Sequence, residues 1–327
     1  MLSKKVIITD LIDYPIIEQN ILGENVEVVA LNVYNSNEIS DNIWGECDGI
    51  IAYDRLNFDK NLIQKLKKCK IISRAGIGYD NIDLGSAKEN NIKISNVPDY
   101  GIIEVSNHTL SFILSFSTGI LEGSNNIKEG KWKRTSEFCF RPNNKVLGII
   151  GMGRIGSEVA KKALAFGLNV VYYDPYNNTK YNSFTRLDSL YELAENSDII
   201  SIHTPLSSET FKMIDDDFFN KCSSNTCLIN TARGNIIDID SLYKAMKKGI
   251  ISTCGLDVLN VEPPDGSQKL VNAYKNNEDW IKNRLIITPH SAFYSPSSLK
   301  DLRIKSALNI KSVFENDKHI NCIKWKS

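Results

Sequence analysis

Three polar side chains in the second half of the chain, each just beyond an apolar run, are suited to acid–base chemistry on an anion. They are Arg233, Glu262 and His290. A guanidinium forms paired, planar hydrogen bonds with a carboxylate, and an imidazole, with an ordinary pKa of about 6.5, exchanges a proton near neutral pH. A carboxylate on the second ring nitrogen favours the charged imidazole. These residues therefore form a candidate set for anion binding and proton transfer.

Reduction of a 2-oxo acid by a nicotinamide needs such a set. A cation must hold the carboxylate and polarise the ketone, and an acid must protonate the developing alkoxide. We assign the first role to Arg233 and the second to His290, with Glu262 keeping the imidazole charged. Residue types alone leave open the alternative that all three side chains are structural.

A glycine-rich segment upstream of these residues has the form of a phosphate-binding turn. Gly151, Gly153 and Gly156 follow an apolar strand over 145–150 and precede a helix predicted over 157–166. The first glycine permits the tight turn, the second lets the backbone approach a pyrophosphate, and the third lets the helix pack on the strand. The amino end of the helix then presents N–H groups to the phosphates. This order of elements indicates a dinucleotide site rather than a structural turn.

An acidic residue, Asp174, ends the next predicted strand. A carboxylate at this place can accept hydrogen bonds from both hydroxyls of an adenine ribose and would repel a 2′-phosphate. The sequence therefore predicts NAD(H) as cofactor, preferred over NADP(H).

The elements that must position these residues follow an alternating pattern of strands and helices. Apolar runs predict two series of strands, over 5–9, 26–31, 49–53, 70–73 and 93–95, and then over 145–150, 169–173, 198–204, 226–230, 252–257 and 285–288. Alternation of this kind predicts parallel sheets covered on both faces, with ligands beyond the carboxyl ends of the strands. We expect an α/β fold of two Rossmann- or flavodoxin-like domains with an interdomain cleft.

The boundary between the two domains is predicted near 98–101. The substrate (catalytic) domain would comprise 1–101 plus 295–327, and the NAD-binding Rossmann domain 102–294. A single helix is expected over 104–121. Its residues are apolar on most faces, which is typical of a buried helix, here between domains or at a subunit interface.

Composition excludes several other classes of protein. The chain has 327 residues, with 39 basic and 39 acidic side chains, so it carries no basic field for nucleic acid. It shows no membrane-spanning stretch and no signal peptide pattern, and we expect no membrane partner. Its seven cysteines are scattered without a metal-binding spacing, which predicts reduced thiols in the cytoplasm and no bound metal.

Four ordered segments resemble the NAD-dependent D-isomer-specific 2-hydroxyacid dehydrogenases. They are the glycine-rich turn, Asn-Thr-Ala-Arg-Gly at 230–234, the segment from Asp257 to Glu262-Pro-Pro, and Thr-Pro-His at 288–290. The segment from Arg74 to Asp83 extends the resemblance over nearly the whole chain. Within the family, Tyr-Asp-Pro-Tyr at 173–176 and the run 290–295 are similar to the C-terminal binding protein branch.

The resemblance implies roles for further residues in binding the cofactor. Asp257 would hold the nicotinamide carboxamide, and Thr231 and Ala232 would line the nicotinamide ring. The backbone of Arg154 and Ile155 would meet the pyrophosphate. The turn formed by Thr204 and Pro205 would lie over the cofactor.

The resemblance also implies substrate-binding residues in the first domain and near His290. Ile77 and Gly78 would offer backbone N–H groups to the substrate carboxylate. Arg74 would face the substrate, or would be a surface cation that continues a run of lysines. Phe293 would shape the pocket for the substrate side chain, or would only pack.

One position departs from the family pattern. Many members carry Glu before the histidine of the long helix, whereas here Asn107 precedes His108. This difference puts any role of the pair in doubt, and we expect His108 to be a core or interface histidine.

The resemblance implies an enzyme that transfers a hydride between NAD(H) and C2 of a 2-oxo or D-2-hydroxy acid, and a homodimer. The complete Arg–Glu–His set favours this activity over the alternative, an NAD(H)-sensing regulatory or binding protein with vestigial activity. An unusual acid, such as one bearing a phosphonate, stays open as the substrate.

Overall fold

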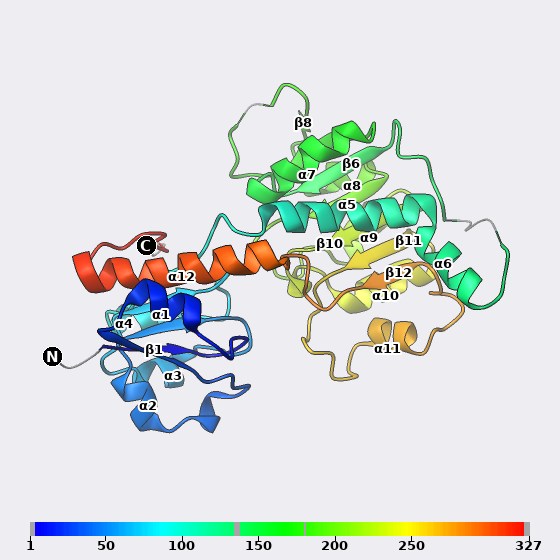
Figure 1. The fold of residues 1–327 in the computed structure, drawn as a ribbon. Coiled ribbons are helices and arrows are strands. Elements are labelled where there is room, and N and C mark those ends of the chain that lie inside the picture. The colour runs from blue at the N-terminus through cyan, green and yellow to red at the C-terminus, as the bar shows by residue number, and fades with distance from the viewer. Residues whose placement is uncertain (1–3, 134–137, 180, 324–327) are drawn as a thin grey trace. The chain divides into compact units, whose positions relative to one another are not determined.

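The computed structural model describes residues 4–133, 138–179 and 181–323. The chain divides into two compact units, one formed by Met1–Tyr100 with Ser295–Ser327, the other by Gly101–Tyr294. We call them unit 1 and unit 2. Each contains a wholly parallel sheet flanked by helices, which confirms the predicted α/β class (Figure 1).

Unit 1 has a five-stranded sheet in the order β2-β1-β3-β4-β5. Its strands are β1 (Lys4–Ile8), β2 (Val26–Ala30), β3 (Gly49–Ala52), β4 (Ile71–Arg74) and β5 (Lys93–Ser95). Its helices are α1 (Ile16–Leu22), η1 (Ser36–Glu38), α2 (Asp41–Glu46), α3 (Lys60–Lys65), α4 (Leu84–Glu89) and α12 (Pro296–Asn316). This strand order is that of flavodoxin-like sheets.

The last helix, α12, returns the end of the chain to unit 1. It packs on α1, where Figure 1 shows the two side by side, and on β3 and β4. Arg303 donates two hydrogen bonds, of 2.7 and 2.6 Å, to the fully buried carboxylate of Glu18 on α1. A paired guanidinium–carboxylate contact of this kind satisfies a charge that would otherwise be costly to bury.

Unit 2 has a seven-stranded sheet in the order β12-β11-β10-β9-β6-β7-β8. Its strands are β6 (Val146–Ile150), β7 (Asn169–Tyr173), β8 (Thr185–Arg186), β9 (Ile199–Ile202), β10 (Thr226–Asn230), β11 (Ile251–Leu256) and β12 (Leu285–Ile287). Its helices are α5 (Ile102–Thr118), α6 (Ile120–Lys128), α7 (Arg154–Ala165), α8 (Leu190–Glu195), α9 (Asp216–Lys221), η2 (Gly234–Ile236), α10 (Ile239–Lys247) and α11 (Lys269–Lys275). The strand order reverses between β6 and β9, as in dinucleotide-binding sheets.

The core of unit 2 lies on both faces of this sheet because successive residues of a strand point to opposite sides. Ile149 and Ile229 pack in one cluster with α5 and α7, whereas Ile150 and Leu228 pack in the other with α8 to α11. Figure 1 shows α5 beside α7, and the two helices are in contact.

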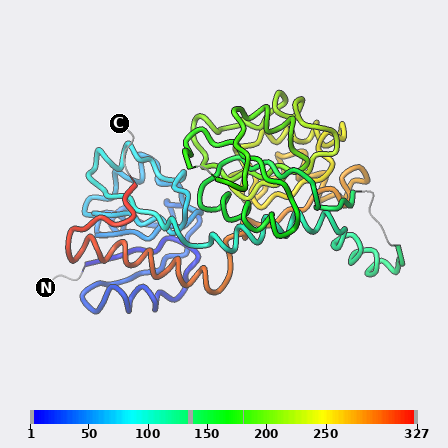
Figure 2. Tube along the Cα trace, turned by 90° about the horizontal axis from the view of Figure 1, so that it is seen from above, coloured from blue at the N-terminus to red at the C-terminus, as the bar shows by residue number. Residues whose placement is uncertain are grey.

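The structure corrects the single helix predicted over 104–121. Gly119 has a φ of 64°, in the left-handed region, and separates α5 from α6. The chain therefore turns at this glycine, and α6 stands out from the body of unit 2 (Figure 2). Among the described residues, no helix is both long and apolar enough to cross a bilayer.

Candidate functional site

The glycine-rich turn connects β6 to α7, and each of its glycines meets a different constraint. Gly151 has a φ of 93°, and a Cβ on it would lie 2.7 Å from the carbonyl oxygen of His203. A Cβ on Gly156 would lie 2.1 Å from the carbonyl oxygen of Gly151. A Cβ on Gly153 would meet nothing within 4 Å. Gly151 and Gly156 are thus needed by the turn itself, whereas Gly153 leaves open space beside it.

Helix α7 begins at Arg154, three residues before the predicted start. The glycine-rich segment therefore supplies the first turn of the helix rather than a loop before it. Arg154 and Ile155 lie in this first turn, whose N–H groups lack partners within the helix and carry its positive dipole end. An anion at this end of α7 would be bound by these N–H groups and stabilised by the helix dipole.

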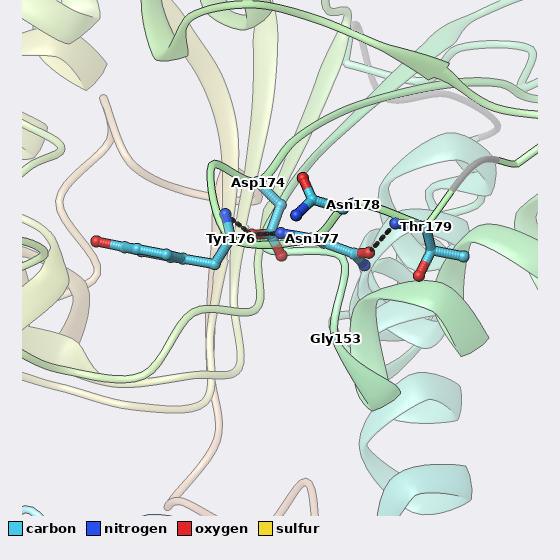
Figure 3. Close-up of a pocket in the computed structure, with 6 residues that line it drawn as sticks. All are labelled: Gly153, Asp174, Tyr176, Asn177, Asn178 and Thr179. Atoms are coloured by element: carbon cyan, nitrogen blue, oxygen red, sulfur yellow. Dashed lines mark hydrogen bonds between the residues drawn. The ribbon is translucent and has the colours of Figure 1, made fainter. Parts of the chain in front are cut away.

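A cavity of about 520 Å³ lies beside the turn. It is lined by Gly153, Asp174, Tyr176, Asn177, Asn178 and Thr179 (Figure 3). The carboxylate of Asp174 accepts hydrogen bonds from the backbone N–H groups of Met152, Tyr176 and Asn177, at 2.8, 2.9 and 3.0 Å. These bonds hold the carboxylate at the end of β7, facing the glycine-rich turn.

The turn after β9 supplies a further polar atom. The hydroxyl oxygen of Thr204 is buried and has no hydrogen-bond partner among the described residues. Buried polar atoms are normally satisfied, so an unsatisfied one indicates a missing ligand or water. The methyl of Thr204 lies 2.8 Å from where a Cβ of Gly151 would be. This turn, with Pro205 next to it, therefore lies against the glycine-rich turn at residues 151–156, which we call the cradle.

His290 and Glu262 form a direct pair. Nδ1 of His290 lies 2.7 Å from Oε2 of Glu262, whose Oε1 accepts the N–H of Leu259 at 2.6 Å. Because a carboxylate only accepts, Nδ1 carries a hydrogen, and exchange of a proton with a ligand falls to Nε2. The ring of Phe293 lies edge-on to the imidazole, with the ring centroids 6.5 Å apart.

Arg233 lies on a tight turn between β10 and η2. The fully buried Asn230 accepts the N–H of Ala232 at 2.9 Å and donates to the carbonyl of Arg233 at 2.9 Å. A Cβ on Gly234 would lie 2.0 Å from the backbone of Leu259, so the Arg233 turn touches the loop that carries Glu262. Asn230 begins the Asn-Thr-Ala-Arg-Gly segment already noted in the sequence, but its task of holding this turn became visible only in the structure.

Asp257 connects the same loops. Its carboxylate is 2% exposed and accepts Thr288 Oγ1 at 2.5 Å and the N–H groups of Ser291 and Ala292, both at 2.9 Å. The side chain therefore holds the loop around His290. The contact of Asp257 with a nicotinamide carboxamide stays a prediction. The same holds for the expectation that Thr231, whose hydroxyl lies 3.0 Å from that of Thr109, lines the nicotinamide ring.

The predicted substrate residues of unit 1 follow β4. Arg74 is the last residue of this strand and is only 8% exposed, so its interpretation as a surface cation is wrong. Its Nη1 donates to the carbonyl of Ala75 at 2.6 Å, and a Cβ on Gly76 would overlap the guanidinium. The Ile77 carbonyl accepts from Asn96 at 2.7 Å, which fixes the loop that leads to Gly78.

Comparison with known proteins gives concordant matches. Residues 110–292 match the sequence model described as D-isomer specific 2-hydroxyacid dehydrogenase, NAD binding domain. The chain is 32% identical to D-3-phosphoglycerate dehydrogenase of Methanocaldococcus jannaschii over 96% of its own length and 58% of that protein. It is 37% identical to hydroxypyruvate reductase of Thermotoga maritima over 67% of its own length and 71% of that protein.

A solved structure shows the same fold. The D-lactate dehydrogenase of Aquifex aeolicus, complexed with NAD and lactic acid, superposes with a TM-score of 0.82 at 29% identity, over 95% of this chain and 96% of that one. The chain spans about half the length of the curated D-3-phosphoglycerate dehydrogenases that it matches.

Proposed function

The chain belongs to the D-isomer specific 2-hydroxyacid dehydrogenase family, and from that premise we propose that it transfers a hydride between NAD(H) and C2 of a 2-oxo or D-2-hydroxy acid. The observation that carries the proposal is the 2.7 Å contact between His290 Nδ1 and Glu262 Oε2, on a loop that touches the Arg233 turn. A charged imidazole and a guanidinium carried by contacting loops would suit a substrate that is both an anion and a ketone.

In the proposed reaction each residue has one task. The bound nicotinamide supplies or accepts the hydride. Arg233 binds the carboxylate and carbonyl oxygen of the substrate, and His290 donates a proton from Nε2 to the oxygen that becomes the hydroxyl. Glu262 stabilises the imidazolium before that transfer. Phe293 would limit the substrate side chain, and Arg74, Ile77 and Gly78 would bind the substrate from unit 1.

The residues of the cradle fit a dinucleotide. The open space at Gly153 admits a pyrophosphate, and the N–H groups of Arg154 and Ile155 would bind it. The unsatisfied hydroxyl of Thr204 supplies a further polar contact, with Pro205 beside it. Asp174 favours NAD(H) over NADP(H), because its fixed carboxylate would repel a 2′-phosphate. Thr231, Ala232 and Asp257 are assigned to the nicotinamide end.

The proposed assembly is a homodimer in the cytoplasm. Helix α6 stands out from unit 2 with exposed apolar side chains, among them Ile120, Leu121 and Ile127, and Trp132 beyond it is 86% exposed. Exposed apolar side chains gathered on one element are typical of subunit contacts. Free thiols at all seven cysteines support a reducing compartment.

A steady-state assay of NADH oxidation against a panel of 2-oxo acids, including glyoxylate, hydroxypyruvate and pyruvate, tests the activity. His290→Gln should lower kcat by about 10²- to 10⁴-fold, the usual contribution of an acid–base group, with NADH binding unchanged. His319→Gln, in unit 1 at the end of the chain, is the matched control. Tight NADH binding without turnover of any acid would instead favour the NAD(H)-sensing protein.

A further inference from the structure

A chain of hydrogen bonds reaches the His290 loop from helix α5. His108 Nε2 lies 3.0 Å from Thr288 Oγ1, which lies 2.5 Å from Asp257 Oδ1. The three residues come from α5, from the residue after β12 and from the residue after β11. They meet only because the two strands are neighbours and α5 packs on this sheet.

The chemistry of the three groups sets the direction of these bonds. The carboxylate of Asp257 only accepts, so the single hydroxyl hydrogen of Thr288 points to Asp257. The Thr288 oxygen must then accept from His108, and Nε2 of His108 carries a hydrogen. The ring of Phe112 lies edge-on to that of His108, with centroids 4.7 Å apart, which restricts rotation of the imidazole.

Asp257, the last member of this hydrogen-bond chain, holds the backbone at and after His290. The N–H of His290 donates to the Asp257 carbonyl at 2.8 Å, and the N–H groups of Ser291 and Ala292 donate to the Asp257 carboxylate. His290 has a φ of 50°, in the left-handed region, which a residue with a side chain adopts only when its surroundings enforce it. The orientation of Asp257 therefore helps to set the direction of the His290 side chain.

We propose that His108 is a positioning residue for the proposed acid–base histidine, acting through Thr288 and Asp257. The inference rests on the proposed function and gives a task to a histidine that the sequence analysis assigned to the core or to an interface. Without the bond from His108, the Thr288 hydroxyl can rotate away from Asp257, and the loop around His290 becomes less well defined.

Paired substitutions test the hydrogen bonds from His108 through Thr288 to Asp257. Gln places a donor nitrogen near the position of Nε2, so His108→Gln should keep kcat within about threefold, whereas His108→Leu should lower it about tenfold. Likewise, Thr288→Ser should keep kcat, and Thr288→Val should lower it about tenfold. KM for the 2-oxo acid and Kd for NADH should change little. The double variant that combines His108→Leu with Thr288→Val should lose no more than the worse single variant, because both substitutions break one pathway.

Thr226→Val is the control, since it also replaces a threonine after or within a strand of this sheet; Thr226 is buried, and its hydroxyl donates to the Ser223 carbonyl at the amino end of β10. It should leave kcat unchanged. A loss of kcat in Thr226→Val as large as that in Thr288→Val, or full activity in His108→Leu, would overturn the proposal.

Side-chain ¹⁵N spectra of the four histidines, assigned with His108→Gln, provide a readout that does not need turnover. His108 should carry a hydrogen on Nε2. A spectrum with the hydrogen on Nδ1 alone would refute the bond pattern, whatever the enzyme's substrate is. Failure of the wild-type protein to turn over any 2-oxo acid would refute the proposed function and leave this spectral test standing.

Discussion

Two glycines of the cradle are required for different reasons, Gly156 for folding and Gly153 for binding a ligand. Gly156 lies against the backbone of Gly151, whereas Gly153 faces open space. A glycine that nothing crowds within the protein is explained by a ligand that approaches closely, as in other dinucleotide turns.

This contrast gives a pair of predictions. Gly153→Ala should leave the thermal unfolding curve almost unchanged and weaken NADH binding at least about tenfold, because the new methyl group would occupy the pyrophosphate position. Gly156→Ala should lower the free energy of unfolding by about 1–3 kcal/mol, the usual cost of overpacking. Thermal melts and fluorescence titration with NADH measure the two effects. Normal NADH affinity in Gly153→Ala would contradict the assigned cradle.

His203, next to the cradle, should make the stability of the protein depend on pH. Desolvation of its imidazole lowers the pKa of His203 to about 3. Between pH 6.5 and 3 the unfolded chain binds a proton at this residue and the folded chain does not, so the free energy of unfolding should fall as the pH drops through this range. His203→Gln should remove this contribution and flatten the curve, as measured by urea unfolding between about pH 4 and 8. An unchanged slope would contradict a neutral His203 imidazole in the folded chain.

At the scale of elements, Gly119 decides where one helix becomes two. Hydrophobic pattern alone predicts a continuous helix over 104–121, because periodicity does not register the sign of φ at one residue. In the structure Gly119 is left-handed and serves α5 as C-cap and α6 as N-cap. This turn directs α6 away from the body of unit 2.

Two alanine substitutions should therefore change the free energy of unfolding in opposite directions. Gly119→Ala should lower the free energy of unfolding by about 1–2 kcal/mol, because a Cβ disfavours the left-handed conformation. Gly123→Ala, inside α6 with nothing within 4 Å of the new Cβ, should raise it by about 0.5–1 kcal/mol through helix propensity. Denaturant titrations of both variants measure the difference. Stabilisation by Gly119→Ala would argue for a continuous helix.

The two-residue strand β8 is an element that the sequence analysis did not find. Thr185 and Arg186 are too short a stretch to show alternation, and they become a strand only by pairing with β7. The predicted strands that were found are longer and apolar, so their pattern is visible without the partner strand.

At the scale of the whole molecule, the proposed dimer makes a prediction about mass. Light scattering should give about twice the chain mass of 36.8 kDa. Ile127→Asp, on the exposed face of α6, should shift the protein towards monomer, because the charge would be buried in the subunit contact. Ile16→Asp, at an exposed apolar residue in unit 1, is the control and should leave the mass unchanged. A monomeric wild-type protein would refute the dimer.

The sequence by itself was enough to predict the α/β class and the family, because strand–helix alternation and the four ordered motifs are local properties of the chain. Tertiary structure alone decided how the candidate residues are held. The bond of Glu262 to His290, the contact of Gly234 with Leu259, and the line from His108 to Asp257 join segments far apart in the chain. Such contacts depend on which strands become neighbours and on side-chain packing between them, which no short stretch of residues encodes.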